Sequence, residues 1–300
     1  MVTVDSILQF RAPELEDACW MTPLLRESGG MASEYSFTTI YMWRTHYQNQ
    51  IAHFRDSLFI RALEQGIPSY LPPIGGIFED NMALLMEHVH AEGHPLRLFC
   101  TDPALLPRIQ ALYPGRFRVE PARDDFDYIY NVSDLAALAG KKYHGKRNHI
   151  HAFSAQYDWS YEPLSDGNSA DVVEMAREWC RLKGNCREKS LQSEKCAIRE
   201  AIAHRQELSL IGGLIRVSGK TVAFTLASPI NSQTIDIHVE KALPDYATAY
   251  TVINREFAAR ELSGYRYINR ENDMGIEGLR RAKESYRPAI LLEKYLLTEV

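Results

Sequence analysis

Three short apolar segments in the second half of the chain constrain the fold most. "LSLIGGLIRVSG", "KTVAFTLAS" and "QTIDIHVEK" follow one another between residues 208 and 241. Each is rich in β-branched or aromatic residues, and polar turn residues separate them, which predicts an antiparallel meander of three strands. We therefore expect an α/β (α+β) protein whose sheets are flanked by helices.

The segments around this meander complete an ordered series. Helices are predicted at 169–183 and 194–206 before it, and a long helix at 245–262 after it. This long helix has an apolar stripe of aromatic and aliphatic residues at helical spacing. The segment "GYRYINR" then reads as a strand, "GIEGLRRAKESY" as a helix and "PAILLEKYLL" as one last strand. This order resembles that of the GNAT acyltransferase fold.

The first half of the chain reads as a weaker copy of the same order. Helices are expected at 13–27 and 33–48, followed by a hairpin in which "QIAHF" and "SLFIRAL" are joined at Arg55-Asp56. Three hundred residues suit about two domains. We predict two tandem GNAT-like domains, 1–122 and 123–300, each with a mixed, mostly antiparallel sheet.

The composition is that of an ordinary globular protein, with 45% hydrophobic and 24% charged residues. No apolar run approaches the roughly 18 residues that suggest a membrane span, and the first residues do not resemble a signal peptide. These features predict a cytoplasmic protein without a transmembrane segment. The net charge of −5 argues against DNA as a partner, but it allows one local anion site.

One concentrated basic segment stands out in this acidic chain. "GKKYHGKRNHIHAF", residues 140–153, contains four cations and three histidines, and no Asp or Glu occurs from Leu135 to Tyr157. On a helix, Lys146 projects into an apolar arc about 80° wide and Arg147 about 40° beyond its edge. The cations could snorkel to solvent, or they could bind a phosphate or carboxylate. We name Lys142, Lys146, Arg147 and His149 as candidate anion-binding residues.

Two charged residues end the third strand of the meander. Glu240 and Lys241 precede the long helix, where a GNAT fold brings the acyl donor and acceptor together. Glu240 could act as a general base and Lys241 could stabilise an oxyanion, although an ion pair at the edge of the sheet would explain them equally well. The following "ALPDYATA" contains no glycine, so the glycine-rich pyrophosphate loop of acetyl-CoA enzymes is missing. Coenzyme A is therefore the less expected donor, and no cofactor is predicted.

A polar loop follows the strand "GYRYINR". Asn269, Arg270 and Glu271 are candidate substrate-binding residues there, with Lys283 from the next helix, because loops after strands often carry sites. The alternative is an exposed polar loop that forms no binding site. No histidine neighbours the carboxylates in the sequence, so no metal is predicted.

Three long segments carry a family resemblance: "DYIYNVSDLAALAGKKYHGKRNHIHAF", "IHVEKALPDYATAYTVINREFA" and "YINRENDMGIEGLRRAKESYRP". Together they resemble a bacterial family, once known only as a domain of unknown function, that is named after the C-terminal domain of phosphatidylglycerol lysyltransferase. The resemblance spans nearly the whole chain and implies a tandem GNAT fold. It also implies kinship with Fem-type transferases, which move an aminoacyl group from tRNA to a lipid or peptide.

The resemblance gives the basic segment a candidate ligand, the end of an aminoacyl-tRNA. The expected activity is transfer of an aminoacyl group to an amine or hydroxyl of a lipid or peptide acceptor. Positioning and oxyanion stabilisation suffice for such chemistry, which fits a site of Lys, Arg and Glu. Two alternatives are a non-catalytic binding or regulatory protein on the same fold, and an N-acyltransferase that uses acyl-CoA.

Overall fold

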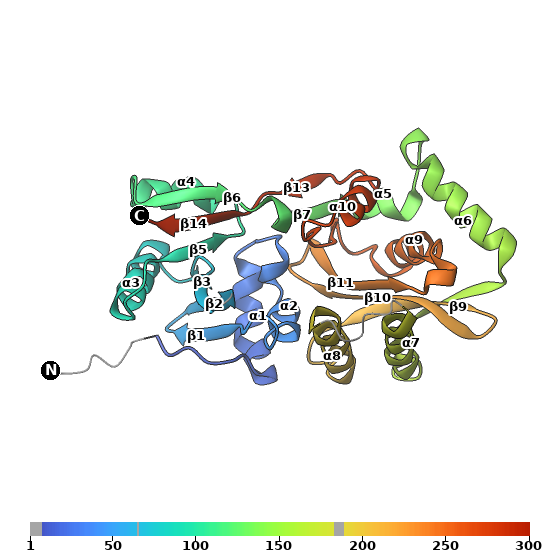
Figure 1. Ribbon diagram of the computed structural model, residues 1–300, viewed down its shortest axis with the longest axis horizontal. Coiled ribbons are helices and arrows are strands. Elements are labelled where there is room, and N and C mark those ends of the chain that lie inside the picture. Colours follow the sequence, from blue (N-terminus) through green and yellow to red (C-terminus); the bar gives the residue numbers. More distant parts are fainter. Residues whose placement is uncertain (1–7, 65, 183–188) are drawn as a thin grey trace.

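The computed structural model describes residues 8–64, 66–182 and 189–300, which form two sheets side by side with helices packed against both (Figure 1). The first sheet contains most of the first half of the chain. Its strands are, in spatial order, β1 (Gln50–Phe54), β2 (Ser57–Glu64), β3 (Ile67–Tyr70), β5 (Arg97–Cys100), β14 (Tyr295–Glu299) and β6 (Phe117–Pro121), with β4 (Ile74–Gly75) paired to β2.

The predicted β1–β2 hairpin is confirmed. Its two-residue turn places Arg55 in the left-handed region, with a φ of 52°, as tight hairpins require. Helix α3 (Phe78–Ala91) buries Phe78, Met82 and Leu85 in the core of this sheet, and α4 (Leu105–Leu112) adds Ile109. Helices α1 (Ala18–Glu27) and α2 (Phe37–Met42) lie between the first sheet and the second half (Figure 1).

The second sheet contains the predicted meander. Its strands are, in order, β13 (Ile290–Leu292), β7 (Asp127–Asn131), β12 (Tyr267–Asn269), β11 (Thr234–Ala242), β10 (Lys220–Pro229), β9 (Ile211–Val217) and β8 (Trp159–Pro163). The β9–β10 and β10–β11 pairs are antiparallel as expected, whereas β11 and β12 are parallel. Both sheets are therefore mixed and mostly antiparallel.

Helices cover both faces of the second sheet. In Figure 1, α7 (Ser169–Leu182) and α8 (Lys189–Ala203) lie on one face, and α9 (Ala249–Glu261) lies on the other. This explains why β10 is buried along nearly its whole length instead of alternating in and out. The largest apolar cluster joins Phe37 and Ile40 of α2 to Phe224 of β10 and Val252 of α9, so the two halves share a core.

The end of the chain departs from the prediction. "PAILLEKYLL" was expected to form one strand, but it forms two, and they belong to different sheets. Strand β13 pairs with β7, whereas β14 inserts between β5 and β6 of the first sheet. The predicted boundary near residue 122 separates β6 from β7, and the structure adds that residues 295–299 return to the first sheet.

Two helix predictions are also refined. The helix expected at 33–48 is the short α2, preceded by a 3₁₀ turn at Ser33–Tyr35 and capped by the Ser36 side chain. The basic segment forms a 3₁₀ turn at Lys141–Tyr143 and then α6 (His144–Gln156), which contributes only Phe153 to the core. Among the described residues, no helix is both long and apolar enough to cross a bilayer.

Candidate functional site

Strand β11 carries one extra residue relative to its neighbour β10. Leu226 of β10 faces Val239, but the next residue, Ala227, faces Ile237, which leaves His238 as the extra residue of a β-bulge. A bulge bends the strand and redirects the side chains around it. The second half of β11 therefore presents its charged residues differently from an uninterrupted strand.

Glu240 and Lys241 leave β11 on opposite faces. Glu240 Oε2 accepts a hydrogen bond from Asn254 of α9 at 3.3 Å. Lys241 Nζ lies 2.8 Å from Glu194 of α8 and 3.9 Å from the ring centre of Trp179 in α7. Neighbouring strand residues alternate in direction, so the two residues predicted to share one catalytic site do not meet.

Arg270 is the partner of Glu240. Its Nη2 lies 2.6 Å from Glu240 Oε1, and its guanidinium carbon is 5.0 Å from the ring centre of Tyr286 and 5.8 Å from that of Tyr130. The other terminal nitrogen, Nη1, is buried and has no hydrogen-bond partner among the described residues. The site therefore holds a fixed guanidinium with one buried donor nitrogen that makes no hydrogen bond to any described residue.

Lys146 of the basic segment reaches the same place from α6. Its Nζ lies 3.7 Å from the ring centre of Tyr286 and 2.7 Å from Ser285 Oγ. Burial, together with the charge of Arg270, lowers the pKa of Lys146 to about 8, against the attraction of Glu240. Three predicted residues, Lys146, Glu240 and Arg270, are thus brought together.

The neighbouring cations of the basic segment have other partners. Arg147 Nη1 donates to the backbone carbonyls of Leu138 and of Gly140, the latter at 2.8 Å. Lys142 is largely exposed and lies 3.4 Å from Asp134. Arg147 therefore braces the turn that precedes its own helix, and Lys142 faces solvent.

His149 lies at the margin of the site. Its ring is exposed, and its Nδ1 is 3.5 Å from Thr251 Oγ1 in α9. The same Thr251 hydroxyl accepts a hydrogen bond from Tyr286 at 3.3 Å. His149 is thus linked to the site through a hydroxyl without facing Arg270 directly.

Asn269 shapes the loop after β12 from inside the protein. It is fully buried, and its amide nitrogen donates to Asp127 and to the carbonyl of Met31, each at 2.8 Å. Its amide oxygen accepts from the backbone of Glu271 at 2.7 Å. Glu271 itself has a φ of 56°, a conformation that costs a non-glycine residue free energy and often marks a site.

Lys283 holds the same loop from the side of α10 (Glu277–Glu284). Its Nζ donates to the carbonyls of Arg270 and of Glu271, the latter at 3.1 Å. Burial, together with the charge of Arg270, lowers the pKa of Lys283 to about 8, against the attraction of Glu271. Asn269 and Lys283 therefore position Arg270 and Glu271.

The sequence analysis missed a buried ion-pair group at the junction of the two sheets. Lys294 lies between β13 and β14 with its Nζ 2.9 Å from Asp127 and 2.8 Å from both carboxylate oxygens of Glu34. Lys294 and Asp127 are completely buried. The signal was an isolated carboxylate in the otherwise apolar strand "DYIYN", because a buried charge requires a partner.

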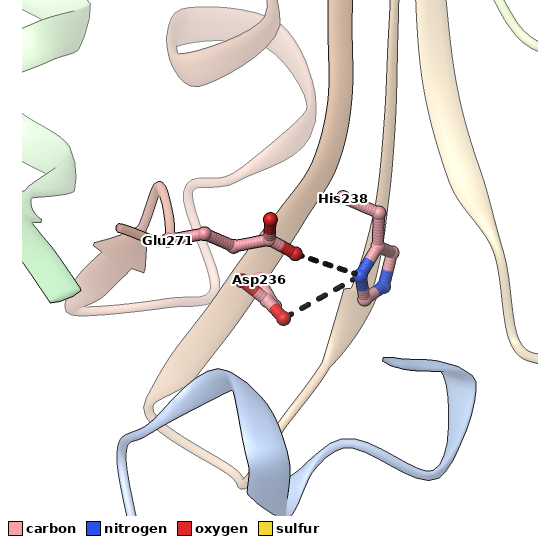
Figure 2. Close-up of side chains that lie close together, drawn as sticks. All are labelled: Asp236, His238 and Glu271. Carbon is pink, nitrogen blue, oxygen red and sulfur yellow. Dashed lines mark ion pairs between the residues drawn. The ribbon is translucent and has the colours of Figure 1, made fainter. Parts of the chain in front are cut away.

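A second missed group lies on the α2 side of β11, whereas Glu240 faces α9. Figure 2 shows its side chains, Asp236, His238 and Glu271. His238 Nδ1 is 3.4 Å from Asp236 Oδ2 and 3.7 Å from Glu271 Oε1. Thr39 Oγ1 of α2 lies 3.1 Å from the same Asp236 oxygen, and His238 Nε2 is 2.7 Å from Ser228 Oγ. The fold thus brings His238 to Glu271, which lies in a loop that has no histidine of its own.

Burial governs the protonation of this group. It raises the pKa of Asp236 well above its ordinary value and that of Glu271 to about 8, although the His238 charge opposes the first shift and Lys283 the second. It also lowers the pKa of His238 against the attraction of Asp236. The sequence signal was the alternation of polar and apolar residues in "TIDIHVE", which places several polar groups on one face of the third strand of the predicted meander.

Solved structures share this fold. A protein of unknown function from Bacteroides thetaiotaomicron is 36% identical over 98% of this chain and 100% of that chain, with a TM-score of 0.92. The L-PGS structure from Bacillus licheniformis matches 96% of this chain and 93% of its own at 17% identity, with a TM-score of 0.66. A tandem GNAT protein from the clavulanic acid pathway covers 98% of both chains at 12% identity and a TM-score of 0.50, which agrees with the predicted tandem GNAT-like fold.

Sequence comparison assigns the family. An uncharacterised protein of Mycoplasmoides gallisepticum is 22% identical over 172 residues, which are 57% of this chain and 55% of that protein. The chain thus spans about half the length of this curated relative. The profile described as "Phosphatidylglycerol lysyltransferase, C-terminal" matches residues 26–298. The chain therefore belongs to the phosphatidylglycerol lysyltransferase C-terminal family.

Proposed function

We propose that this protein transfers an aminoacyl group from aminoacyl-tRNA to an amine or hydroxyl group of a lipid or peptide acceptor. Family membership supports the reaction class. The observation that carries the proposal is the unpartnered Nη1 of Arg270, held in place by Glu240 and two aromatic rings. A preorganised donor of this kind can bind the oxyanion that forms when an ester is attacked.

The proposed step needs one charge stabiliser and one proton acceptor. The acceptor nitrogen or oxygen attacks the ester carbonyl carbon, and the carbonyl oxygen gains negative charge that Arg270 Nη1 stabilises. Lys146, which is partly neutral near pH 8, takes the proton of the nucleophile and returns it to the tRNA ribose oxygen as the ester bond breaks. In this scheme Glu240 fixes Arg270, and Arg270 takes the oxyanion role predicted for Lys241.

Two features around the site support aminoacyl-tRNA as the proposed donor. Residues 238–250 contain no glycine, so no bare backbone loop is available for a pyrophosphate. Helix α6 and the 3₁₀ turn before it present exposed cationic or titratable side chains, among them Lys142 of the turn and His149 and His151 of the helix. Such a helix suits the phosphates near an RNA end, and its contribution should weaken as salt concentration rises.

The test uses radiolabelled aminoacyl-tRNA as the donor, with phosphatidylglycerol vesicles and lysine-containing peptides as alternative acceptors. A parallel reaction supplies acetyl-CoA with the same acceptors. We expect label to move from tRNA to one acceptor class, and Arg270→Lys to slow this transfer about 10²–10³-fold, as loss of an oxyanion donor does. The matched control, Arg266→Lys, changes an exposed arginine beside Tyr267 and should leave the rate unchanged.

Two results would contradict the proposal. Acetyl transfer from acetyl-CoA without aminoacyl transfer would identify the alternative N-acyltransferase. An Arg270→Lys protein that melts like the wild type and transfers label equally fast would remove Arg270 from the reaction. Lys146→Ala provides a second variant, which should slow transfer without destabilising the fold, because Lys146 lies at the edge of the core.

A further inference from the structure

The group formed by Asp236, His238 and Glu271 has the spacing of a shared ligand set. The distances of 3.4 and 3.7 Å from His238 Nδ1 to the two carboxylates exceed the 2.7–3.2 Å typical of N–H···O hydrogen bonds. Ligand atoms about 2.0–2.2 Å from a tetrahedral metal lie about 3.4 Å from one another. One ligand atom from each residue lies within 4.8 Å of the other two.

Two oxygens of this group have no hydrogen-bond partner in the part of the chain that the structure describes. Glu271 Oε1, the atom that points toward His238, and Asp236 Oδ1 are both buried and accept no hydrogen bond from any described residue. The Asp236 side chain has no exposed surface. Unsatisfied buried carboxylate oxygens are costly, so their presence indicates a ligand at this position.

The surroundings of His238 suit metal ligation. A metal-bound histidine usually donates its other ring N–H to a neighbouring acceptor, and Ser228 Oγ lies 2.7 Å from Nε2. Nδ1, which lies 3.3 Å from Thr39 Oγ1, can then accept from that hydroxyl or direct its lone pair toward a metal held by the carboxylates. The Glu271 side chain is 25% exposed, which provides access from solvent at that edge of the group.

We propose that Asp236, His238 and Glu271 bind one divalent first-row transition-metal ion, such as Zn²⁺ or Mn²⁺, with Thr39 orienting Asp236. One imidazole and two carboxylates suit these ions better than Mg²⁺ or Ca²⁺, which prefer an all-oxygen set. The site lies on the α2 side of β11, whereas Glu240 faces α9, and its existence does not depend on the transfer activity. It would join α2 of the first half to β11 and the β12 loop of the second.

The experiment uses the full chain without an affinity tag, stripped with EDTA and dialysed. Zn²⁺ and Mn²⁺ are titrated calorimetrically, bound metal is counted by mass spectrometry, and Co²⁺ absorption reports the ligand geometry. We expect one equivalent per chain and a higher melting temperature with metal. His238→Gln and Glu271→Gln should each weaken binding beyond the roughly 10–100-fold effect of losing an outer-shell partner.

Glu240→Gln is the matched control, because it makes the same chemical change in a nearby carboxylate that Arg270 already neutralises. It should bind metal like the wild type. Binding of less than about a tenth of an equivalent by the wild type would overturn the proposal. So would undiminished binding by folded His238→Gln and Glu271→Gln proteins, and Asp236→Asn replaces either variant that fails to fold.

Discussion

The ammonium of Lys294 lies 2.9 Å from Oδ1 of Asp127, and neither side chain has any exposed surface. Glu34, which belongs to the first half of the chain, lies 2.8 Å from the same ammonium. Lys294 stands between the strand that belongs to the second sheet and the strand that belongs to the first. One buried cation therefore connects three segments that are remote in the sequence.

Replacing this cation should destabilise the fold strongly. Lys294→Ala would leave the buried Asp127 and the partly buried Glu34 without their ammonium partner, so we expect the free energy of unfolding to fall by about 3–5 kcal/mol. Urea denaturation followed by fluorescence measures the change. Lys142→Ala removes a cation from an exposed pair and should cost less than about 1 kcal/mol. Equal losses in the two variants would contradict the structural role of Lys294.

Asp273 should give stability a recognisable pH dependence. Burial alone would raise its pKa, but hydrogen bonds from Arg280, Tyr128 and the amide of Gly275 outweigh burial and hold the pKa well below its ordinary value. A carboxyl with a depressed folded-state pKa stabilises the fold above its unfolded pKa, about 3.9, and loses this contribution as the pH falls. Asp273→Asn should therefore cost about 3 kcal/mol at pH 7, and the difference from wild type should shrink below about pH 4.

Unfolding curves collected from pH 7 to pH 3 test this prediction. The control is Asp166→Asn, whose carboxylate is mostly exposed beside Arg205. Its effect should be small throughout the range. A gap between wild type and Asp273→Asn that stayed constant down to pH 3 would show that the charge of Asp273 does not matter.

The pKa of Lys146 should respond in opposite directions to its two charged neighbours. Burial is the largest cause of its depression to about 8, the charge of Arg270 contributes to it and Glu240 opposes it. Arg270→Gln should consequently raise the pKa of Lys146, and Glu240→Gln should lower it. Trace acylation of lysines at a series of pH values, read by mass spectrometry, follows the neutral amine. Lys220, which pairs with Glu178, serves as the control and should be acylated to the same extent in all three proteins.

Arg147 should matter for stability more than for binding. Its guanidinium bridges the carbonyls of Leu138 and Gly140, where the backbone φ angles are 45° and 82°. Arg147→Ala should cost about 1–2 kcal/mol through the lost charge-assisted hydrogen bonds. Aminoacyl transfer at saturating substrate should stay near the wild-type rate, whereas Lys146→Ala should lose it. An Arg147→Ala protein that kept its stability but lost transfer would instead support Arg147 as an anion-binding residue.

Local patterns in the sequence predicted much of the second sheet. The meander of β9, β10 and β11 and the helix α9 follow from short-range apolar spacing and turn residues, and the structure confirms them. The division of "PAILLEKYLL" could not be predicted in this way. Its first strand pairs with β7, and its second pairs with β5 and β6. Pairing with strands so remote in the sequence does not alter the apolar periodicity of the segment itself.

The sequence predicted which residues form the candidate site, but it predicted their arrangement only in part. Lys146, Glu240 and Arg270 were all singled out, and the structure brings them together. The alternation of β11 separates Lys241 from this group, and the bulge at His238 decides which face each residue takes. A bulge depends on the neighbouring strand, so the sequence of β11 alone could not reveal it.

The position of β14 has a consequence for how the protein is made. Residues 122–294 separate β6 from the strand that must lie beside it, so a ribosome exposes β5 and β6 long before their common neighbour exists. During that interval both strands present open edges that could pair with another chain. The first sheet can close only after the whole second half has emerged. Chaperone binding during synthesis should thus concentrate on residues 97–121, and a nascent chain stalled before residue 295 should be more sensitive to protease there than the finished protein.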